Sequence, residues 1–381
     1  MSRYNLRIAV VSGIPIYIHW SFWLLILWVV LSSIFSGQTD AQYLLWRLLL
    51  IGGLVVSVIL HELGHAMAAK IFGIPTKDIT MYPFGGVASV ARIPDRPVQE
   101  LIVAIAGPVV NFLIVGILAT WFYISGDSLD WTTEDLLLRE EDIFSLQHLM
   151  ASLGFMNIIL AVFNLLPAFP MDGGRVLRAL LAIKLPYAKA TKIAALIGQV
   201  FAVLFIIVGI YGNPVLVLVG FFVFVAAAQE RQQVEERTAM YGLAVADALL
   251  REVPTLTVSQ TLEDAIQRLL NTQGRSFLIV DPLGMPAGSL SREQIIQALS
   301  EGKPRTTSLV QVMDPELLVV PPTMPLSEGY QLLNEHQKPF LVVVQDNRLL
   351  GIVDTENIAE FLLIRRATRA GGVSSVYQKI N

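Results

Sequence analysis

Residues 43–72 read YLLWRLLLIGGLVVSVILHELGHAMAAKIF, and the first half of this stretch is almost free of charge. Leu48–Leu60 contains no charged residue, and Ser57 is its one conventionally polar member. About 20 apolar residues in a helix cross the hydrocarbon core of a bilayer, so the stretch is long enough to span a membrane. It predicts a transmembrane helix with a compact polar group near one end.

The composition of the whole chain agrees with a membrane protein. The chain has 381 residues, of which 54% are hydrophobic and 15% are charged, whereas soluble domains carry about 25% charged residues. There is no cysteine, which excludes disulfides, thiolate metal ligands and cysteine nucleophiles. The net charge is −4, and without a basic block no nucleic-acid partner is expected.

The apolar runs are concentrated in the first 230 residues or so, while residues 240 to 365 have an ordinary globular composition. Six runs reach or approach spanning length: Ile16–Phe35, Tyr43–Phe72, Val98–Tyr123, Gln147–Phe169, Thr191–Tyr211 and Pro214–Ala228. We therefore expect about six transmembrane helices in residues 1–232, and a soluble part in residues 240–367. Residues 368–381 form a C-terminal tail.

Lysine and arginine lie mainly on one set of flanks of these runs. That set holds thirteen of them, namely Arg3, Arg7, Lys70, Lys77, Arg92, Arg96, Arg175, Arg178, Lys184, Lys189, Lys192, Arg231 and Arg237. The opposite flanks hold only Arg47 and Arg139. Because basic flanks stay in the cytoplasm, we expect both termini and the soluble part to be cytoplasmic, in a prokaryotic plasma membrane.

Two stretches do not fit a simple bundle of spans. Ile79–Ile93 reads ITMYPFGGVASVARI, where a Pro-Phe-Gly-Gly turn precedes alternating residues, and this pattern predicts a β-hairpin. The hairpin is too short to span, so it lies in the cytoplasm or dips into a protein-lined cavity. Gly173–Lys184 is either an amphipathic surface helix or a plain connector.

His61-Glu62-Leu63-Gly64-His65 forms an H-E-x-x-H motif. Residues four apart share a helix face, so both imidazoles can bind one metal ion while the glutamate serves as a general base. Counted from Tyr43 at about 1.5 Å per residue, His61 lies roughly 27 Å along the helix, near the cytoplasmic end of the span. The alternative is a buried polar cluster that joins helices.

A catalytic zinc ion needs a third protein ligand and an open position. The candidate is Asp172, in the run Asn164–Arg175 (NLLPAFPMDGGR). It lies at the cytoplasmic end of the fourth span, at the membrane level expected for His61. The alternative is that Asp172 caps the helix that begins at Gly173.

These motifs resemble those of the site-2 protease family of intramembrane zinc metalloproteases, in the branch that carries cystathionine-β-synthase (CBS) domains. The matching segments are His61–His65, Asn164–Gly174 (family pattern N-x-x-P-x-x-P-x-D-G-G), Ala106–Asn111 (AGPVVN) and Pro83–Gly86 (PFGG). They cover roughly residues 12 to 230 in the family's order.

The resemblance implies one zinc ion held by His61, His65 and Asp172, with Glu62 as the catalytic base. Asn111 and Asn164 fall on family positions that line the active site, where they bind the unwound substrate or the oxyanion; helix–helix hydrogen bonds are the alternative. His19 has no assigned role. The hairpin is expected to receive the extended substrate as an added strand.

The soluble part contains a loose internal repeat. Phe277–Asp281 (FLIVD) recurs as Phe340–Val344 (FLVVV), and Gly288 recurs as Gly351, both 63 residues later. Each copy reads strand, helix, strand, strand, helix, with the helices expected at Leu262–Leu270 and Leu326–Leu333. The duplicated α/β unit resembles a CBS pair, with copies at about 240–302 and 305–367.

CBS domains often bind adenine nucleotides through a Gly-x-x-Thr/Ser-x-x-Asp pattern. The first copy has Gln294 in place of the final aspartate, and the second has Asp354 in place of the hydroxyl residue. The nucleotide-binding residues are therefore unknown. An adenine nucleotide and a second copy of the chain, in a homodimer, both remain candidate partners of the pair.

The function expected from this reading is regulated intramembrane proteolysis. A zinc endopeptidase would hydrolyse a peptide bond in or near a transmembrane helix of a membrane-protein substrate, with a regulatory or dimerising CBS tail. The alternatives are a CBS-gated ion channel or transporter and a non-catalytic pseudoprotease that binds partners. Polar residues gathered at one depth favour the enzyme over a channel, and the intact Glu62 favours it over a pseudoprotease.

Overall fold

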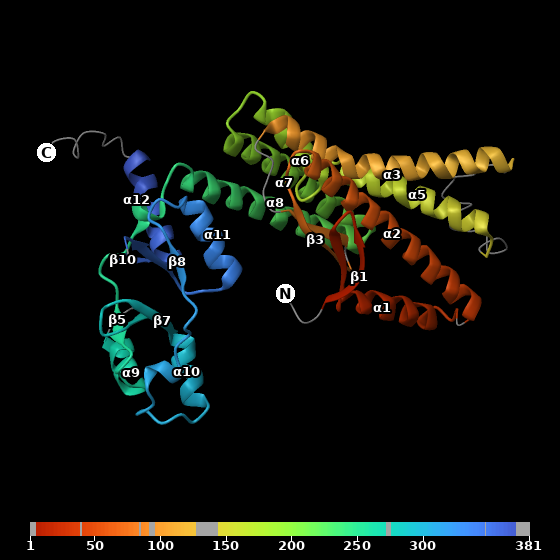
Figure 1. Cartoon of the computed structure of the whole chain (residues 1–381). Helices are drawn as coiled ribbons and strands as arrows, with labels where there is room; N and C mark the ends of the chain where they lie inside the picture. Colours follow the sequence, from red (N-terminus) through yellow and green to blue (C-terminus); the bar gives the residue numbers. More distant parts are fainter. Residues whose placement is uncertain are drawn as a thin grey trace. The chain divides into compact units, whose positions relative to one another are not determined.

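The computed structural model describes residues 5–38, 40–83, 85–90, 96–126, 144–271, 276–346 and 348–370. The chain divides into two compact units, Met1–Val234 and Glu235–Asn381, and each is considered separately (Figure 1). The elements of the first unit are β1 (Asn5–Val11), β2 (Ile14–His19), α1 (Phe22–Phe35), α2 (Ala41–Ile71), β3 (Thr76–Tyr82), β4 (Gly85–Val90), α3 (Pro97–Ser125), α5 (Leu146–Asn164), α6 (Asp172–Ala182), α7 (Tyr187–Gly212) and α8 (Pro214–Met240).

Five helices of the described residues are long and apolar enough to cross a membrane: α2, α3, α5, α7 and α8. They correspond to the second to sixth apolar runs of the sequence. Helix α3 packs against both α2 and α5 (Figure 1). The expected multi-pass helical architecture is therefore confirmed.

The first apolar run, Ile16–Phe35, is divided between two elements rather than forming one helix. Its start belongs to strand β2, where Ile14 and Ile16 are buried on one face, and its remainder forms the 14-residue helix α1. A continuous apolar run does not by itself distinguish a buried strand from a helix. Pairing of β2 with its neighbours decides the outcome here.

The β-hairpin expected at 79–93 is formed by β3 and β4, which pair antiparallel with Thr80 opposite Val87. The hairpin is part of a four-stranded sheet in the order β1-β2-β3-β4, which the sequence did not suggest. Strand β2 pairs parallel with β3. Phe84 and residues 91–95 lie outside the described residues.

The chain bends sharply between α5 and α6. Helix α5 ends at Asn164, five residues before the end of the expected span, because prolines at 167 and 170 cannot continue a helix. Helix α6 then begins at Asp172 and has a strongly one-sided apolar face. The amphipathic helix expected at 173–184 is therefore confirmed, and Asp172 is its first residue.

The second unit contains two copies of one α/β arrangement. The first copy holds β5 (Thr255–Thr257), α9 (Leu262–Asn271), β6 (Ser276–Val280), β7 (Pro286–Ser291) and α10 (Arg292–Ser300). The second holds β8 (Leu318–Val320), α11 (Leu326–His336), β9 (Leu341–Gln345), β10 (Arg348–Val353) and α12 (Thr355–Ala370). In each sheet the first strand pairs parallel with the middle strand, and the third pairs antiparallel with it.

The repeated glycines lie at two of the places where the backbones of the copies approach each other. A Cβ on Gly288 would come within 2.8 Å of the carbonyl oxygen of Asp314, and a Cβ on Gly351 would overlap that of Leu250. Backbone bridges flank both contacts, Ser289 with Asp314 and Leu250 with Ile352. Glycine is thus repeated because the backbones cross closely at equivalent positions.

Candidate metal centre

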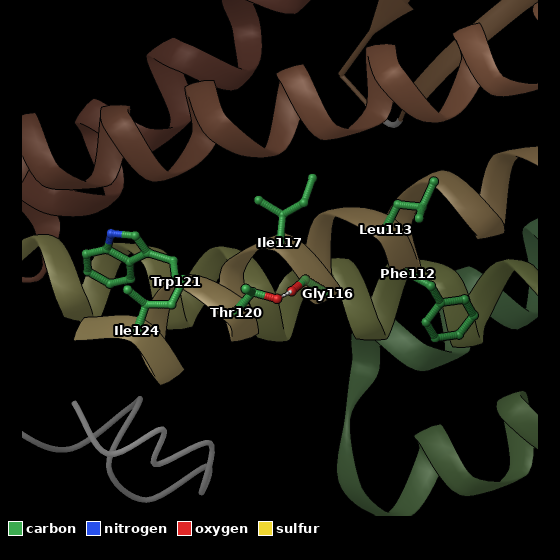
Figure 2. Close-up of a pocket in the computed structure, with 7 residues that line it drawn as sticks. All are labelled: Phe112, Leu113, Gly116, Ile117, Thr120, Trp121 and Ile124. Atoms are coloured by element: carbon green, nitrogen blue, oxygen red, sulfur yellow. Dashed lines mark hydrogen bonds between the residues drawn. The ribbon is translucent and has the colours of Figure 1, made fainter. Parts of the chain in front are cut away.

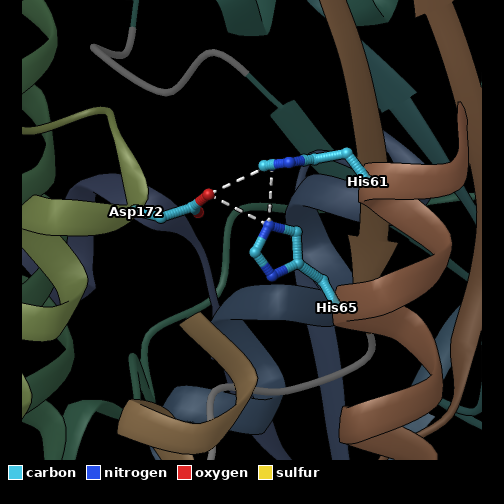
Figure 3. A group of neighbouring side chains, drawn as sticks. All are labelled: His61, His65 and Asp172. Carbon is cyan, nitrogen blue, oxygen red and sulfur yellow. Dashed lines mark hydrogen bonds and ion pairs between the residues drawn. The ribbon is translucent and has the colours of Figure 1, made fainter. Parts of the chain in front are cut away.

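His61 and His65 lie one turn apart on α2 and point to the same side (Figure 3). Their exposed fractions are only 4% and 6%. The helix forms here because its preceding residues are uncharged and apolar, and it places residues i and i+4 on one face. The two imidazole centroids are 4.7 Å apart and nearly perpendicular.

Asp172 reaches the histidines from the first turn of α6 and is equally buried. The start of its helix lies close to the end of α5: a Cβ on Gly173 would overlap the carbonyl oxygens of Leu165 and Leu166. The two glycines at 173 and 174 therefore permit the close backbone approach that brings the carboxylate to this place.

The three side chains converge on one point. The distances from Asp172 Oδ2 to His61 Nε2 and to His65 Nε2 are both 3.1 Å, and the two Nε2 atoms are also 3.1 Å apart (Figure 3). These residues form a group whose ligand atoms can hold a metal ion. Asp172 does not cap its helix, whose N-cap residue is Met171, so the capping interpretation is not the one observed.

The hydrogen bonds on the far side of each imidazole decide where its proton lies. His65 Nδ1 is 2.7 Å from the carbonyl oxygen of Val103, which can only accept, so Nδ1 carries the proton. His61 Nδ1 is 2.5 Å from Asn111 Oδ1 and donates to it in the same way. Neutral histidines bonded in this manner present a lone pair at Nε2, which is the usual arrangement for metal ligands.

With both Nδ1 atoms protonated, three lone pairs face one another in a buried space, and a bound metal ion would make this arrangement favourable. Zinc bonds of about 2.0 Å in tetrahedral geometry separate two ligands by about 3.3 Å, close to the 3.1 Å observed between His61, His65 and Asp172. Three protein ligands leave one position open for water or substrate. The donor set fits a catalytic zinc site.

Glu62 lies on the same helix turn as the two histidines and is half-buried. A Cβ on Gly86 would come within 2.8 Å of Glu62 Cγ, so the start of strand β4 passes directly beside this glutamate. The hairpin and the proposed base are thus neighbours in space, although 24 positions separate them in the sequence.

Helix α3 supports the two histidines through one face. Val103, Gly107 and Asn111 are spaced four apart, so they share a face of the helix. Val103 and Asn111 accept the two Nδ1 protons, and a Cβ on Gly107 would overlap the imidazole of His65. Sequence reasoning missed Val103, because it acts through its backbone carbonyl and any residue type offers one.

The two candidate asparagines have different surroundings. Asn111 is fully buried, and its amide nitrogen donates to Asn157 Oδ1 at 2.8 Å, so both ends of its side chain are occupied. Asn164 is the last residue of α5 and is half-buried. Within the described residues, the hydrogen bonds of the metal-ligand group involve Asn111 and Val103 and do not include Asn164.

Two other features are separate from the group. His19 Nδ1 pairs with Ser21 Oγ at 2.7 Å and its ring lies 4.9 Å from that of Tyr82, and it is not part of the described metal-ligand group. An open pocket of about 570 Å³ lies along the outer face of α3 (Figure 2). Its lining residues are Phe112, Leu113, Gly116, Ile117, Thr120, Trp121 and Ile124, and it holds none of the candidate residues.

Comparison with known proteins identifies relatives of both units. The model of peptidase family M50 matches residues 49–205, and the CBS domain model matches residues 245–301 and 309–364. A zinc metalloprotease of Methanocaldococcus jannaschii is 35% identical over 284 residues, which cover 73% of this chain and 76% of that protein. A relative from Synechocystis sp. is 30% identical over 380 residues, covering 94% and 95%.

Among solved structures, the site-2 protease from Methanocaldococcus jannaschii aligns with a TM-score of 0.42 and 36% identity, covering 60% of this chain and 95% of that one. The family match and the two relatives described above support a protease, and they support neither a CBS-gated channel or transporter nor a non-catalytic pseudoprotease. Because relatives at these identities align over three quarters or more of their own length, the chain belongs to peptidase family M50 and is an intramembrane zinc metalloprotease followed by a CBS pair.

Proposed function

We propose that His61, His65 and Asp172 hold the zinc ion of this protease and that Glu62 is its general base. The observation that supports this assignment is the triangle of ligand atoms 3.1 Å apart, with both Nδ1 protons directed away from it. The substrate is a membrane protein, and the bond hydrolysed lies in or near one of its transmembrane helices.

A bound zinc ion supplies Lewis acidity to the scissile carbonyl and to the attacking water. Glu62 takes the proton from that water and later delivers it to the leaving amine, as general acid–base catalysis requires. His61 and His65 donate their Nδ1 protons to Asn111 Oδ1 and to the carbonyl oxygen of Val103, which orients the Nε2 atom of each ring toward the metal position. The burial of all three ligands limits the access of water to the site.

The substrate segment must be extended when it is cut, because a helix hides its peptide bonds. Strand β4 is a terminal strand of the described sheet, and its Gly86 lies beside Glu62. A substrate segment added as a strand to β4 would pass beside Glu62. Main-chain hydrogen bonds would hold it, so many substrate sequences could bind. This arrangement supports substrate binding by strand addition.

We assign different roles to the two candidate asparagines. The side chain of Asn111 accepts a hydrogen bond from His61 and donates one to Asn157. This favours a positioning role over direct contact with substrate. Asn164 ends α5 eight residues before Asp172 and is half-buried. It is the proposed donor to the unwound substrate or to the oxyanion.

The CBS pair is proposed to lie in the cytoplasm, as do both termini, in a prokaryotic plasma membrane. The excess of lysine and arginine on one set of flanks supports this orientation. An adenine nucleotide and a second copy of the chain are the candidate partners of the pair. The substitutions at Gln294 and Asp354 argue against the usual nucleotide contacts, which leaves dimerisation or a structural role better supported.

The decisive experiment compares Glu62→Gln with Asp172→Ala in the purified, reconstituted full chain. Glu62→Gln should keep one zinc ion per chain and lose cleavage of single-span proteins by at least about 10²-fold, since it removes only the base. Asp172→Ala should lose both zinc and cleavage. Metal content measured by atomic emission separates the two, and full proteolysis by Glu62→Gln would overturn the mechanism.

A further inference from the structure

A line of buried polar side chains runs from His61 away from the metal-ligand group. It consists of Asn111 on α3, Asn157 on α5 and Ser57 on α2, with exposed fractions of 0%, 0% and 5%. Asn111 Nδ2 donates to Asn157 Oδ1 at 2.8 Å, and Asn157 Nδ2 donates to Ser57 Oγ at 3.0 Å. The line therefore crosses three membrane-spanning helices and ends on a metal ligand.

Two backbone carbonyls set the direction of every hydrogen bond in this line. Asn157 Nδ2 also donates to the carbonyl oxygen of Leu153 at 2.8 Å, and Ser57 Oγ donates to that of Gly53 at 3.0 Å. A carbonyl can only accept, so the amide nitrogen of Asn157 must face Leu153 and its oxygen must face Asn111. The orientation of Asn157 thus follows from the backbone of α5.

The orientation of Asn157 in turn fixes the orientation of Asn111 and the tautomer of His61. Because Asn157 offers an oxygen, Asn111 must turn its amide nitrogen toward it and its own oxygen toward His61. His61 Nδ1 then has to be the protonated nitrogen, and Nε2 keeps its lone pair. A reversed Asn111 would place an N–H donor against Nδ1 and favour the other tautomer, whose Nε2 carries the proton and binds no metal.

We propose that Asn157 is a positioning residue of the metal centre, which acts through Asn111 to hold His61 in its metal-binding tautomer. This rests on the proposed role of His61 as a zinc ligand. His65 needs no such relay, since the carbonyl of Val103 accepts its Nδ1 proton directly. The Nδ1 protons of the two histidine ligands are therefore held by different means: a backbone carbonyl accepts that of His65, and a side chain of another helix accepts that of His61.

The test compares two substitutions of similar size at one position in the full chain. Asn157→Leu removes the oxygen that orients Asn111, and zinc affinity should fall by about 10- to 100-fold, the range seen when partners of metal ligands are lost. Asn157→Asp keeps an oxygen toward Asn111 Nδ2 in either protonation state, so zinc affinity should stay at the wild-type value. Chelator competition measures both.

Two further measurements separate positioning from simple loss of packing. Cobalt(II) bound in place of zinc should give a tetrahedral absorption spectrum in wild type and Asn157→Asp, and an altered one in Asn157→Leu. Asn111→Asp, whose two oxygens need no orientation, should restore metal affinity to Asn157→Leu. Thermal unfolding of the metal-free forms reports stability independently of the metal.

Equal metal affinity in wild type and Asn157→Leu would overturn the inference, and so would an equal loss in the Leu and Asp variants. Should Asn157→Leu not fold, Asn157→Ala, which only removes atoms, carries the same expected loss and the same contradiction. A wild-type chain that binds no zinc would instead refute the proposed function, so the two failures are distinguishable.

Discussion

Gly107 lies against both histidine ligands of the metal-ligand group. A Cβ at this position would overlap the imidazole of His65 and come within 2.7 Å of Cε1 of His61. Gly116, on the same helix, would meet nothing within 4 Å. Both glycines lie in the interior of α3, but a side chain would clash at Gly107 and would have free space at Gly116.

Gly107→Ala should displace the imidazoles and lower zinc affinity by at least about tenfold, as loss of ligand orientation does elsewhere. Gly116→Ala should leave zinc affinity unchanged and slightly raise the thermal unfolding temperature, because alanine favours a helix over glycine by about 1 kcal/mol. Zinc content and unfolding of the purified variants check both. Wild-type affinity in Gly107→Ala would show that the rings have room to move.

Helix α6 is short and carries Asp172 at its start, so its position decides where the third ligand lies. Arg178, on the same helix, is 2% exposed and pairs with Glu100 of α3 and Glu230 of α8, each at 2.5 Å. The guanidinium also lies 5.0 Å from the ring centres of Phe169 and Tyr187. Arg178 thus joins α6 to the neighbouring helices of the first unit.

Arg178→Leu should destabilise the metal-free protein by about 3–5 kcal/mol, because it leaves the buried Glu100 without its counter-charge. Combining it with Glu100→Leu should recover much of this loss, since an apolar pair can replace a buried ion pair. Lys184→Leu, at an exposed position just beyond the end of the same helix, is the control and should change little. Thermal unfolding in detergent measures all three variants. An unchanged unfolding temperature in Arg178→Leu would contradict the proposal that Arg178 holds α6 against α3 and α8.

Strand β4 is the element on which the proposed substrate binding depends. Val87→Pro should lower cleavage by about two- to tenfold and leave zinc content unchanged, since it removes one main-chain donor worth about 0.5–1.5 kcal/mol. Ile8→Pro is the control: Ile8 lies at the other edge of the sheet, in an irregularity of the β1–β2 register, and is as exposed as Val87. Unchanged cleavage by Val87→Pro would argue against strand addition.

At the scale of the whole molecule, the sheet of the first unit places β2 and β3 on the same side of any membrane that α1 and α2 enter. Strand β2 precedes α1 and strand β3 follows α2, yet the two strands pair in parallel. The chain must therefore leave the sheet along α1 and return along α2. This agrees with an even number of crossings between β2 and β3, although α1 has only 14 residues.

The absence of cysteine allows this orientation to be tested by single introduced thiols. A thiol in Gln38→Cys, between α1 and α2, should react with an impermeant maleimide in intact cells, because the proposed orientation places this segment on the external side. Tyr241 lies at the start of the soluble part and is 87% exposed. A thiol in Tyr241→Cys should react only after permeabilisation. The reverse pattern would invert the proposed topology.

The prediction of the fold from sequence succeeded where a signal is local. Apolar runs of about spanning length predicted six spanning helices, of which five are found among the described residues. The H-E-x-x-H spacing predicted the pair on α2, and the 63-residue repeat predicted the duplicated unit. It was incomplete where pairing over long distances decides the outcome: the start of the Ile16–Phe35 run is a strand because it pairs with β1 and β3, and no local pattern reports that.

The sequence by itself determined the membrane-spanning class of the chain, its internal repeat and the residues able to bind a metal, because hydrophobicity, periodicity and residue chemistry are properties of short segments. Only the tertiary structure decided that Asp172 meets the two histidines at 3.1 Å, that Asn111 faces His61 rather than an open cleft, and that the hairpin passes beside Glu62. These contacts join segments tens of residues apart, and they form where glycines at 86, 107 and 173 allow close approach.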